Sequence, residues 1–320
     1  MTETQNELVK QSKMENDGVF RILTLDGGGA KGFYTLGVLQ EIEAMLGVEL
    51  YKKFDLIYGT STGAIIAALI GLGYKVEDIH KLYKTHVPSV MSCKSADDKT
   101  AALQALAKKV FGNKLFTDMK TDVGIVSAKW ITERPLIFKT NLKQAHGRKG
   151  TFEPGFGVKV ADAVQASCSA YPFFNRKNIK TSKGDEIELI DGGYCANNPT
   201  LYAIADATKA FEIKHENIRV VSIGVGNYPE PKYGFIKSVF KKWLPIQLLQ
   251  KTLEINTQSM DQLREVLFSD IQTIRISDTF ERPEMATDLL EHDVKKLNMI
   301  KQRGSESFAI REKQLRAFLL

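Results

Sequence analysis

The residue whose surroundings most suggest chemistry is Ser61, which lies between Gly59 and Gly63 in the pattern G-x-S-x-G. The apolar run FDLIYG (54–59) precedes it, and the apolar run AIIAALIGLG (64–73) follows it. A serine at such a sharp strand-to-helix turn is held in a strained conformation with its hydroxyl exposed, and the glycines allow close backbone approach. A tight turn with an incidental serine has the same letters, but the flanking strand and helix favour a nucleophile for acyl transfer.

An aspartate, Asp191, ends the run IELID (187–191) and is followed by Gly192 and Gly193. In isolation this residue could be part of a turn and nothing more. A serine nucleophile needs a base, however, and none of the histidines ends a predicted strand with a motif around it. The five histidines are His80, His86, His146, His215 and His292. We therefore predict that Asp191 accepts the proton of Ser61 directly.

A glycine-rich loop, DGGGAKG (26–32), follows a β-rich run, and two functions compete for it. Gly27, Gly29 and Gly32 satisfy the dinucleotide fingerprint G-x-G-x-x-G, which also requires an acidic residue about 20 positions further on, at the end of the next strand. Glu49 has that distance, but it precedes the next strand. A dinucleotide-binding oxidoreductase is therefore the weaker alternative.

The same loop serves a hydrolase in a different way. Consecutive glycines expose backbone N–H groups that can receive the oxyanion formed when a nucleophile attacks an ester. This interpretation assigns an oxyanion hole to Gly27, Gly28 and Gly29, with Lys31 adding positive potential beside it. It also explains why the loop occurs together with the serine and aspartate motifs, which a dinucleotide site leaves unexplained.

Strand-like and helix-like patterns alternate along the first two thirds of the chain. The β-rich runs are 19–26, 54–59, 123–126, 135–140, 187–191 and 219–226, and helical patterns occur at 32–46, 64–73, 99–111 and 158–169. This alternation predicts an α/β fold in which helices cover both faces of a mainly parallel sheet. Chemistry in such sheets gathers at the carboxyl ends of the strands, where all three glycine-rich motifs fall.

The chain of 320 residues divides into three predicted parts. Residues 1–18 are expected to be a flexible polar tail, 19–228 the catalytic core, and 229–320 a mainly helical extension packed on that core. The polar stretch SVMSCKSADDKT (89–100) is expected to be a loop or part of a lid.

The segment YGFIKSVFKKWL (233–244) has aromatic and aliphatic residues along one face of a predicted helix, with lysines off that face. Such a helix either packs on the core, which is the commoner case, or lies in an anionic lipid interface. Both alternatives stay open.

Composition narrows the class of protein. No apolar run reaches the roughly 20 residues that span a bilayer, and the N-terminal residues lack the apolar core of a signal peptide, so we expect a cytoplasmic protein. Three widely spaced cysteines argue against a disulfide framework and a zinc site. We expect no metal and no cofactor. We also expect no nucleic-acid partner. A net charge of +6 suits anionic partners such as phospholipid headgroups, although a solvated basic surface has the same charge.

Four ordered segments resemble blocks of the patatin-like phospholipase family. The family's oxyanion block G-G-G-x-[RK]-G matches residues 27–32, its nucleophile elbow matches 59–63, and its D-G-[GA] block matches 191–193. The stretch ASCSAYPFF (166–174) resembles a further block, a helix end followed by proline and aromatic residues. The resemblance spans about residues 20–200 and says little beyond about residue 230.

This resemblance implies a three-layer α/β/α fold and a serine–aspartate dyad that cleaves fatty acyl esters without metal or cofactor. By similarity, Ser61 attacks the acyl carbonyl, Asp191 accepts its proton, and amides of the glycine loop and of Thr62 hold the oxyanion. Water then hydrolyses the acyl-enzyme, with Asp191 again as the base. Further residues of the matched motifs support these groups: Lys31, Gly32, Gly59, Gly63, Gly192 and Gly193.

The opening LTLDGGGAKGFYTLGVLQEIE (23–43) also resembles bacterial patatins that act in cyclic-oligonucleotide antiphage signalling, or CBASS. Those proteins are activated by cyclic dinucleotides such as cyclic GMP-AMP and then degrade the cell's own membrane. The resemblance implies a phospholipid membrane surface as partner, with peripheral binding to the inner membrane in the active state.

An unrestrained phospholipase would damage its host, so we expect low basal activity that rises when a cyclic dinucleotide binds, with homo-oligomers on activation. The helical C-terminal third could carry oligomer contacts or a ligand site. Two alternatives stay open: a constitutive lipid acyl hydrolase, and a non-catalytic module that keeps only the fold.

Overall fold

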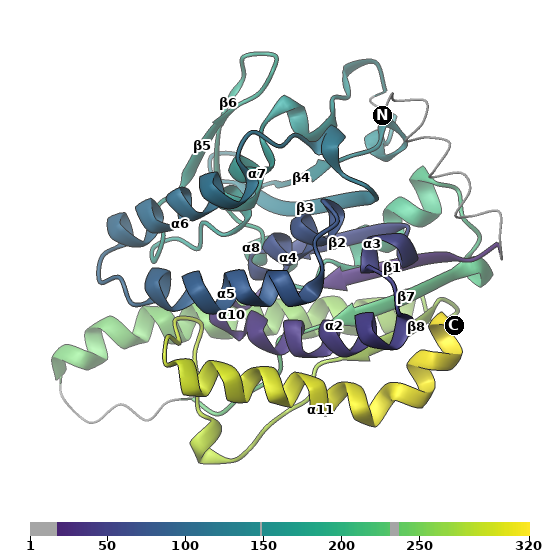
Figure 1. Ribbon diagram of the computed structural model, residues 1–320. Coiled ribbons are helices and arrows are strands. Elements are labelled where there is room, and N and C mark those ends of the chain that lie inside the picture. The colour runs from purple at the N-terminus through teal and green to yellow at the C-terminus, as the bar shows by residue number, and fades with distance from the viewer. Residues whose placement is uncertain (1–17, 148, 231–236) are drawn as a thin grey trace.

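One central sheet organises the structure, a computed structural model that describes residues 18–147, 149–230 and 237–320, with the backbone alone for 237–246. The sheet contains eight strands among these residues (Figure 1). They are β1 (Phe20–Leu25), β2 (Leu56–Thr60), β3 (Asp122–Lys129), β4 (Pro135–Lys139), β5 (Lys177–Lys180), β6 (Glu186–Asp191), β7 (Ile218–Ile223) and β8 (Gln272–Ile276).

The strands are ordered β5-β6-β3-β2-β1-β7-β8, and β4 pairs with β3 as well. β3, β2, β1, β7 and β8 run parallel to one another, whereas β4 and β6 pair antiparallel with β3, and β5 pairs antiparallel with β6. All five residues of β2 are buried, as expected for a parallel strand covered on both faces. The predicted α/β class with a mainly parallel sheet is confirmed.

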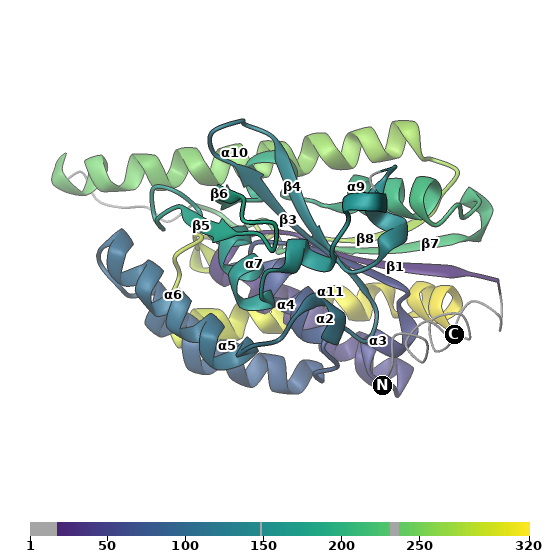
Figure 2. The same cartoon turned by 90° about the horizontal axis from the view of Figure 1, so that it is seen from above.

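Helices cover both faces of this sheet, which makes three layers (Figure 2). One face carries α2 (Gly32–Leu46), α4 (Thr62–Gly71), α5 (Val76–Met91), α6 (Ala96–Phe111), α7 (Val160–Ser167) and α11 (Val294–Leu319), together with the short α3 (Leu50–Lys53). The other face carries α8 (Gly193–Ala196), α9 (Thr200–Ala205) and α10 (Lys237–Leu267). In the part of the chain that the structure describes, no helix is both long and apolar enough to span a bilayer.

The alternation of side chains along β1 shows how the two layers of core form. Phe20 and Ile22 pack toward α9, whereas Leu23 and Leu25 pack among the helices of the other face. Successive side chains of a strand point to opposite faces, so one short apolar run contributes to both cores. Thr24 lies on the same face as Phe20 and Ile22 and joins a buried polar network described below.

The structure differs from the sequence predictions in three places. β5 and β8 were not predicted; β8 continues the sheet beyond β7 within a region expected to be mainly helical. Most of the stretch 89–100 is helical, because α5 continues to Met91 and α6 begins at Ala96, and only 92–95 form a loop. Its polar residues stabilise the start of α6: the hydroxyl of Ser95 accepts the amide of Asp98, and acidic side chains suit a helix N-terminus. For the segment 233–244, the predicted amphipathic face lies outside the described residues.

Candidate active site

Strand β3 brings the two predicted catalytic residues together by pairing with two strands along one edge. Thr60, the last residue of β2, lies opposite Val126, and Asp191, the last residue of β6, lies opposite the next residue, Ser127. Both Val126 and Ser127 also pair with β4, which therefore takes the other edge. The turn after β2, which carries Ser61, and the end of β6 consequently meet at adjacent positions of β3.

Ser61 occupies a strained turn between β2 and α4. Its backbone has φ 52° and ψ −121°, a conformation that non-glycine residues rarely adopt. A Cβ atom on Gly63 would lie 2.2 Å from the carbonyl oxygen of Leu25, and one on Gly59 would lie 2.3 Å from that of Gly63. Gly63 therefore allows the turn to pack against β1, and Gly59 allows the turn itself to be tight.

The Ser61 side chain lies beside the carboxylate of Asp191, close enough to lower the pKa of that carboxyl group, and Asp191 is 2% exposed. The amide of Gly193 donates a hydrogen bond, 2.7 Å long, to Oδ1 of the same carboxylate. Burial raises the pKa of Asp191 to about 7, although the neighbouring Ser61 side chain and the Gly193 amide act in the opposite direction. A carboxylate with a pKa near neutral is suited to accept a proton from a hydroxyl group.

The end of α7 supports both residues, a role that the sequence did not reveal. The amide of Ser61 donates to Oγ of Ser167 at 2.9 Å, and Oγ of Ser167 in turn donates to a carbonyl of β3. The amide of Asp191 donates to the carbonyl oxygen of Ser169 at 3.0 Å. Cys168 lies between them and borders the same cavity as Ser61, and burial raises the pKa of its thiol well above the ordinary value.

The glycine loop faces Ser61 with only part of the predicted set of donors. The amide of Gly27 donates to the carbonyl oxygen of Asn197 at 3.0 Å, so it is not free for an oxyanion, in contrast to the prediction. The amides of Gly28, Gly29 and Thr62 have no hydrogen-bond partner among the described residues. All three of these residues border the cavity that contains Ser61.

Lys31, which was predicted to add positive potential beside the oxyanion hole, does not border the cavity itself. Its side chain is 4% exposed. Burial lowers the pKa of Lys31, while acidic neighbours, chiefly Glu254 and Asp288, favour its charged form. A Cβ atom on Gly32 would lie 2.4 Å from Oγ1 of Thr62, so Gly32 allows α2 to pack closely against the start of α4.

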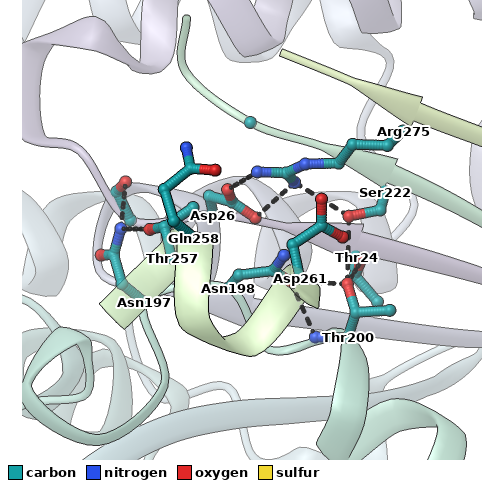
Figure 3. Close-up of polar contacts among 12 residues, drawn as sticks. Thr24, Asp26, Asn197, Asn198, Thr200, Ser222, Thr257, Gln258, Asp261 and Arg275 are labelled. Atoms are coloured by element: carbon teal, nitrogen blue, oxygen red, sulfur yellow. Dashed lines mark hydrogen bonds and ion pairs between the residues drawn. The ribbon is translucent and has the colours of Figure 1, made fainter. Parts of the chain in front are cut away.

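A buried ion pair holds the first residue of the glycine loop (Figure 3). The guanidinium of Arg275, on β8, donates to both carboxylate oxygens of Asp26, and Nη1 also donates to Oγ of Ser222 at 2.9 Å. Burial raises the pKa of Asp26 to about 6, with Arg275 acting in the opposite direction. The network continues from Ser222 to Thr200 and then to Thr24 of β1.

Asn197 connects the loop to α10 (Figure 3). Its Nδ2 donates to the carbonyl oxygen of Gly27 at 3.2 Å and to Oγ1 of Thr257 at 2.7 Å. Its backbone amide donates to Oδ1 of Asn256 at 2.8 Å. Arg275, Asn197 and Thr257 had no motif around them, and only long-range contacts reveal their relation to the loop.

The cavity at the site is apolar apart from the residues named above. It encloses about 780 Å³, open solvent at its mouth included. Its apolar walls come from four helices and two loops and include Ile65, Val90, Leu103, Phe173, Leu253 and Leu289. All five histidines lie within the described ranges, and none of them lines this cavity.

Residues 23–204 match the family described as patatin-like phospholipase. The chain belongs to this family. It is 70% identical over 305 residues to the "cUMP-AMP-activated phospholipase" of Escherichia coli, and the match covers 95% of each chain. It is also 25% identical to a "cGAMP-activated phospholipase" of Pseudomonas aeruginosa (90% and 87% covered) and 25% identical to "Patatin-2-Kuras 4" of Solanum tuberosum (80% and 75% covered).

The family resemblance stated from the motifs is thereby confirmed, and the chain is a hydrolase. The family match covers the glycine loop, the serine turn and the strand that ends at Asp191. The glycine loop therefore belongs to the hydrolase and is not evidence for a dinucleotide-binding oxidoreductase. In this patatin-like phospholipase, the serine, aspartate and glycine-loop motifs thus meet where β2, β6 and the loop after β1 come together.

Proposed function

We propose that this patatin-like phospholipase releases fatty acids from membrane phospholipids through a dyad of Ser61 and Asp191. The observation that supports it most is that the Ser61 side chain and the buried Asp191 carboxylate lie beside each other at the wall of one apolar cavity. The cavity suits an acyl chain, since burying methylene groups is favourable and the walls offer few polar groups.

In the first step, Oγ of Ser61 bonds to the acyl carbon while Asp191 takes the hydroxyl proton. The amides of Gly28, Gly29 and Thr62 stabilise the oxyanion of the tetrahedral intermediate. The intermediate collapses, and the leaving alcohol oxygen of the lysophospholipid takes the proton from Asp191. Water then attacks the acyl-enzyme with Asp191 as base. The fatty acid is released, and the Ser61 hydroxyl is regenerated.

We further propose that a cyclic dinucleotide activates the enzyme and that cUMP-AMP is the activator. The sequence alone suggested cyclic GMP-AMP as an example, but the relative that is 70% identical is named for activation by cUMP-AMP. Peripheral binding to the inner membrane, homo-oligomers on activation and a role in antiphage signalling belong to the same proposal.

The test is fatty-acid release from phosphatidylethanolamine–phosphatidylglycerol vesicles, with cUMP-AMP, with cyclic GMP-AMP and without nucleotide. We expect release with cUMP-AMP, little release without nucleotide, and none from Ser61→Ala under any condition. Ser182→Ala, which changes an exposed serine that does not border the cavity, is the control.

A fluorophosphonate probe should label Ser61 in the wild-type enzyme. Labelling of another residue, or activity in Ser61→Ala, would overturn the dyad. Full activity without any nucleotide would leave a constitutive acyl hydrolase.

A further inference from the structure

A second cavity lies beside the one at Ser61. It lies between α4, α5, α6 and α7 and is open to solvent. Both cavities are bordered by Ile65, Val87, Leu103 and Leu106, so they meet at these four side chains. Nothing in the mechanism described above uses the second cavity.

The second cavity extends along α4 away from the nucleophile. Ser61 precedes α4, Ile65 borders both cavities, and Leu69 borders only the second. Residues four apart lie on the same face of a helix, so these three positions form one line. At 1.5 Å per residue, the line from Ser61 to Leu69 is about 12 Å long.

The chemistry of the walls determines what can bind there. The described lining residues are aliphatic or aromatic. The one hydroxyl group among them, that of Tyr83, donates a hydrogen bond to the carbonyl oxygen of Thr62 at 2.8 Å. A phosphate, sugar or headgroup would lose its hydrogen bonds to water without replacement, which is costly. An unbranched hydrocarbon chain meets no such cost.

We propose that the second cavity is a subsite for the distal part of a long acyl chain whose carbonyl lies at Ser61. The subsite makes the enzyme selective for long unbranched acyl groups, because each additional methylene that it buries contributes roughly fourfold in affinity. This inference rests on the proposed acyl-hydrolase function and adds to it the part of the substrate that sets chain-length preference.

The first test uses the wild-type enzyme. A long-chain fluorophosphonate with a diazirine at the end of its chain is attached to Ser61, photolysed, and the cross-linked peptide is identified by mass spectrometry. Cross-links to the parts of α5 or α6 that line only the second cavity, around Leu82 or Ala107, support the subsite. Cross-links confined to α10, or a chain end that reacts only with solvent, overturn it.

The second test narrows the subsite. Ala107 lines the second cavity but not the first, and Ala107→Phe should reduce the ratio of kcat/KM for the p-nitrophenyl ester of palmitate to that for butyrate by about tenfold or more. Ala105→Phe places the same side chain on the exposed face of the same helix and should leave the ratio unchanged. Esters are presented in detergent micelles with cUMP-AMP present, and thermal melting reports whether each variant folds.

The outcomes separate the subsite from the proposed function. An unchanged ratio in folded Ala107→Phe overturns the subsite, even if all esters are hydrolysed. If Ala107→Phe does not fold, Val110→Phe narrows the same cavity from a half-buried position, and the cross-linking result stands without either variant. Failure of the wild-type enzyme to hydrolyse any ester would instead contradict the proposed function.

Discussion

The side chain of Asn197 donates to Oγ1 of Thr257 at 2.7 Å and, through the same Nδ2 atom, to the carbonyl oxygen of Gly27 at 3.2 Å. Thr257 belongs to α10, and its hydroxyl donates to the carbonyl oxygen of Leu253 one turn earlier. Leu253 also lines the cavity that contains Ser61. One connection between the glycine loop and α10 therefore runs through the buried side-chain amide of Asn197.

Removing the Thr257 hydroxyl should impair turnover more than substrate binding. In Thr257→Val the Nδ2 group of Asn197 loses one buried partner, which typically costs 1–3 kcal/mol or so, and the loop is less firmly held. Because an oxyanion hole acts in the transition state, we expect kcat to fall about tenfold with KM nearly unchanged. Steady-state kinetics on a soluble fluorogenic ester measure both constants.

Two variants control for other causes. Thr257→Ser keeps the hydroxyl and should restore most of kcat. Thr252→Val removes an exposed threonine of α10 that also donates to the carbonyl four residues earlier, and it should behave like the wild type. Equal losses in both valine variants, or a change confined to KM, would contradict a positioning role.

Activity should rise with pH and level off above about pH 7. Asp191 can accept a proton only when it is ionised, and burial raises its pKa to about 7. Below that value, kcat/KM should fall about tenfold for each unit of pH. A pH profile on the soluble ester checks this, and a profile that is flat between about pH 5 and pH 8 would rule out Asp191 as the base.

Asp191→Asn should abolish most activity while making the fold more stable. Loss of a general base typically reduces the rate by 10²–10⁴ or so. The pKa of Asp191 is raised above its unfolded value of 3.8, so its contribution to stability is greatest at low pH and is lost as the pH rises toward about 7. The amide side chain of the variant does not ionise, so its contribution to stability does not fall as the pH rises.

Melting temperatures at about pH 5 and pH 8 measure the stability effect. The gain of Asp191→Asn over the wild type should be larger at the higher pH. A variant that melts below the wild type at both values would contradict the expected cost of burying the ionised carboxylate.

Gly63→Ala should disrupt the turn that carries Ser61. The added Cβ would lie 2.2 Å from the carbonyl oxygen of Leu25 and 2.7 Å from that of Asp26, and both belong to backbone that cannot move independently. We expect lost labelling of Ser61 by the fluorophosphonate and a lower melting temperature. Gly150→Ala is the control, because a Cβ there meets nothing within 4 Å. Normal labelling of Gly63→Ala would show that the turn tolerates a side chain.

Local patterns in the sequence were sufficient to predict the family, the α/β class and the position of each glycine-rich motif at a strand end. Those features are local, because a strand, a tight turn and a helix are specified by residues that are adjacent in the chain. The absence of a histidine with a motif around it pointed to Asp191, and the structure places that carboxylate beside the Ser61 side chain. The family assignment then followed from the order of the motifs.

Tertiary structure decided which groups are available to the site. The register of β3 places the end of β2 beside the end of β6, and the antiparallel direction of β6 had no signal in its own residues. The amide of Gly27 was predicted as a free donor, but Asn197, which is 170 residues away in the chain, takes it. Such pairings depend on which distant segments pack together, whereas local propensities only determine which segments become strands, turns or helices.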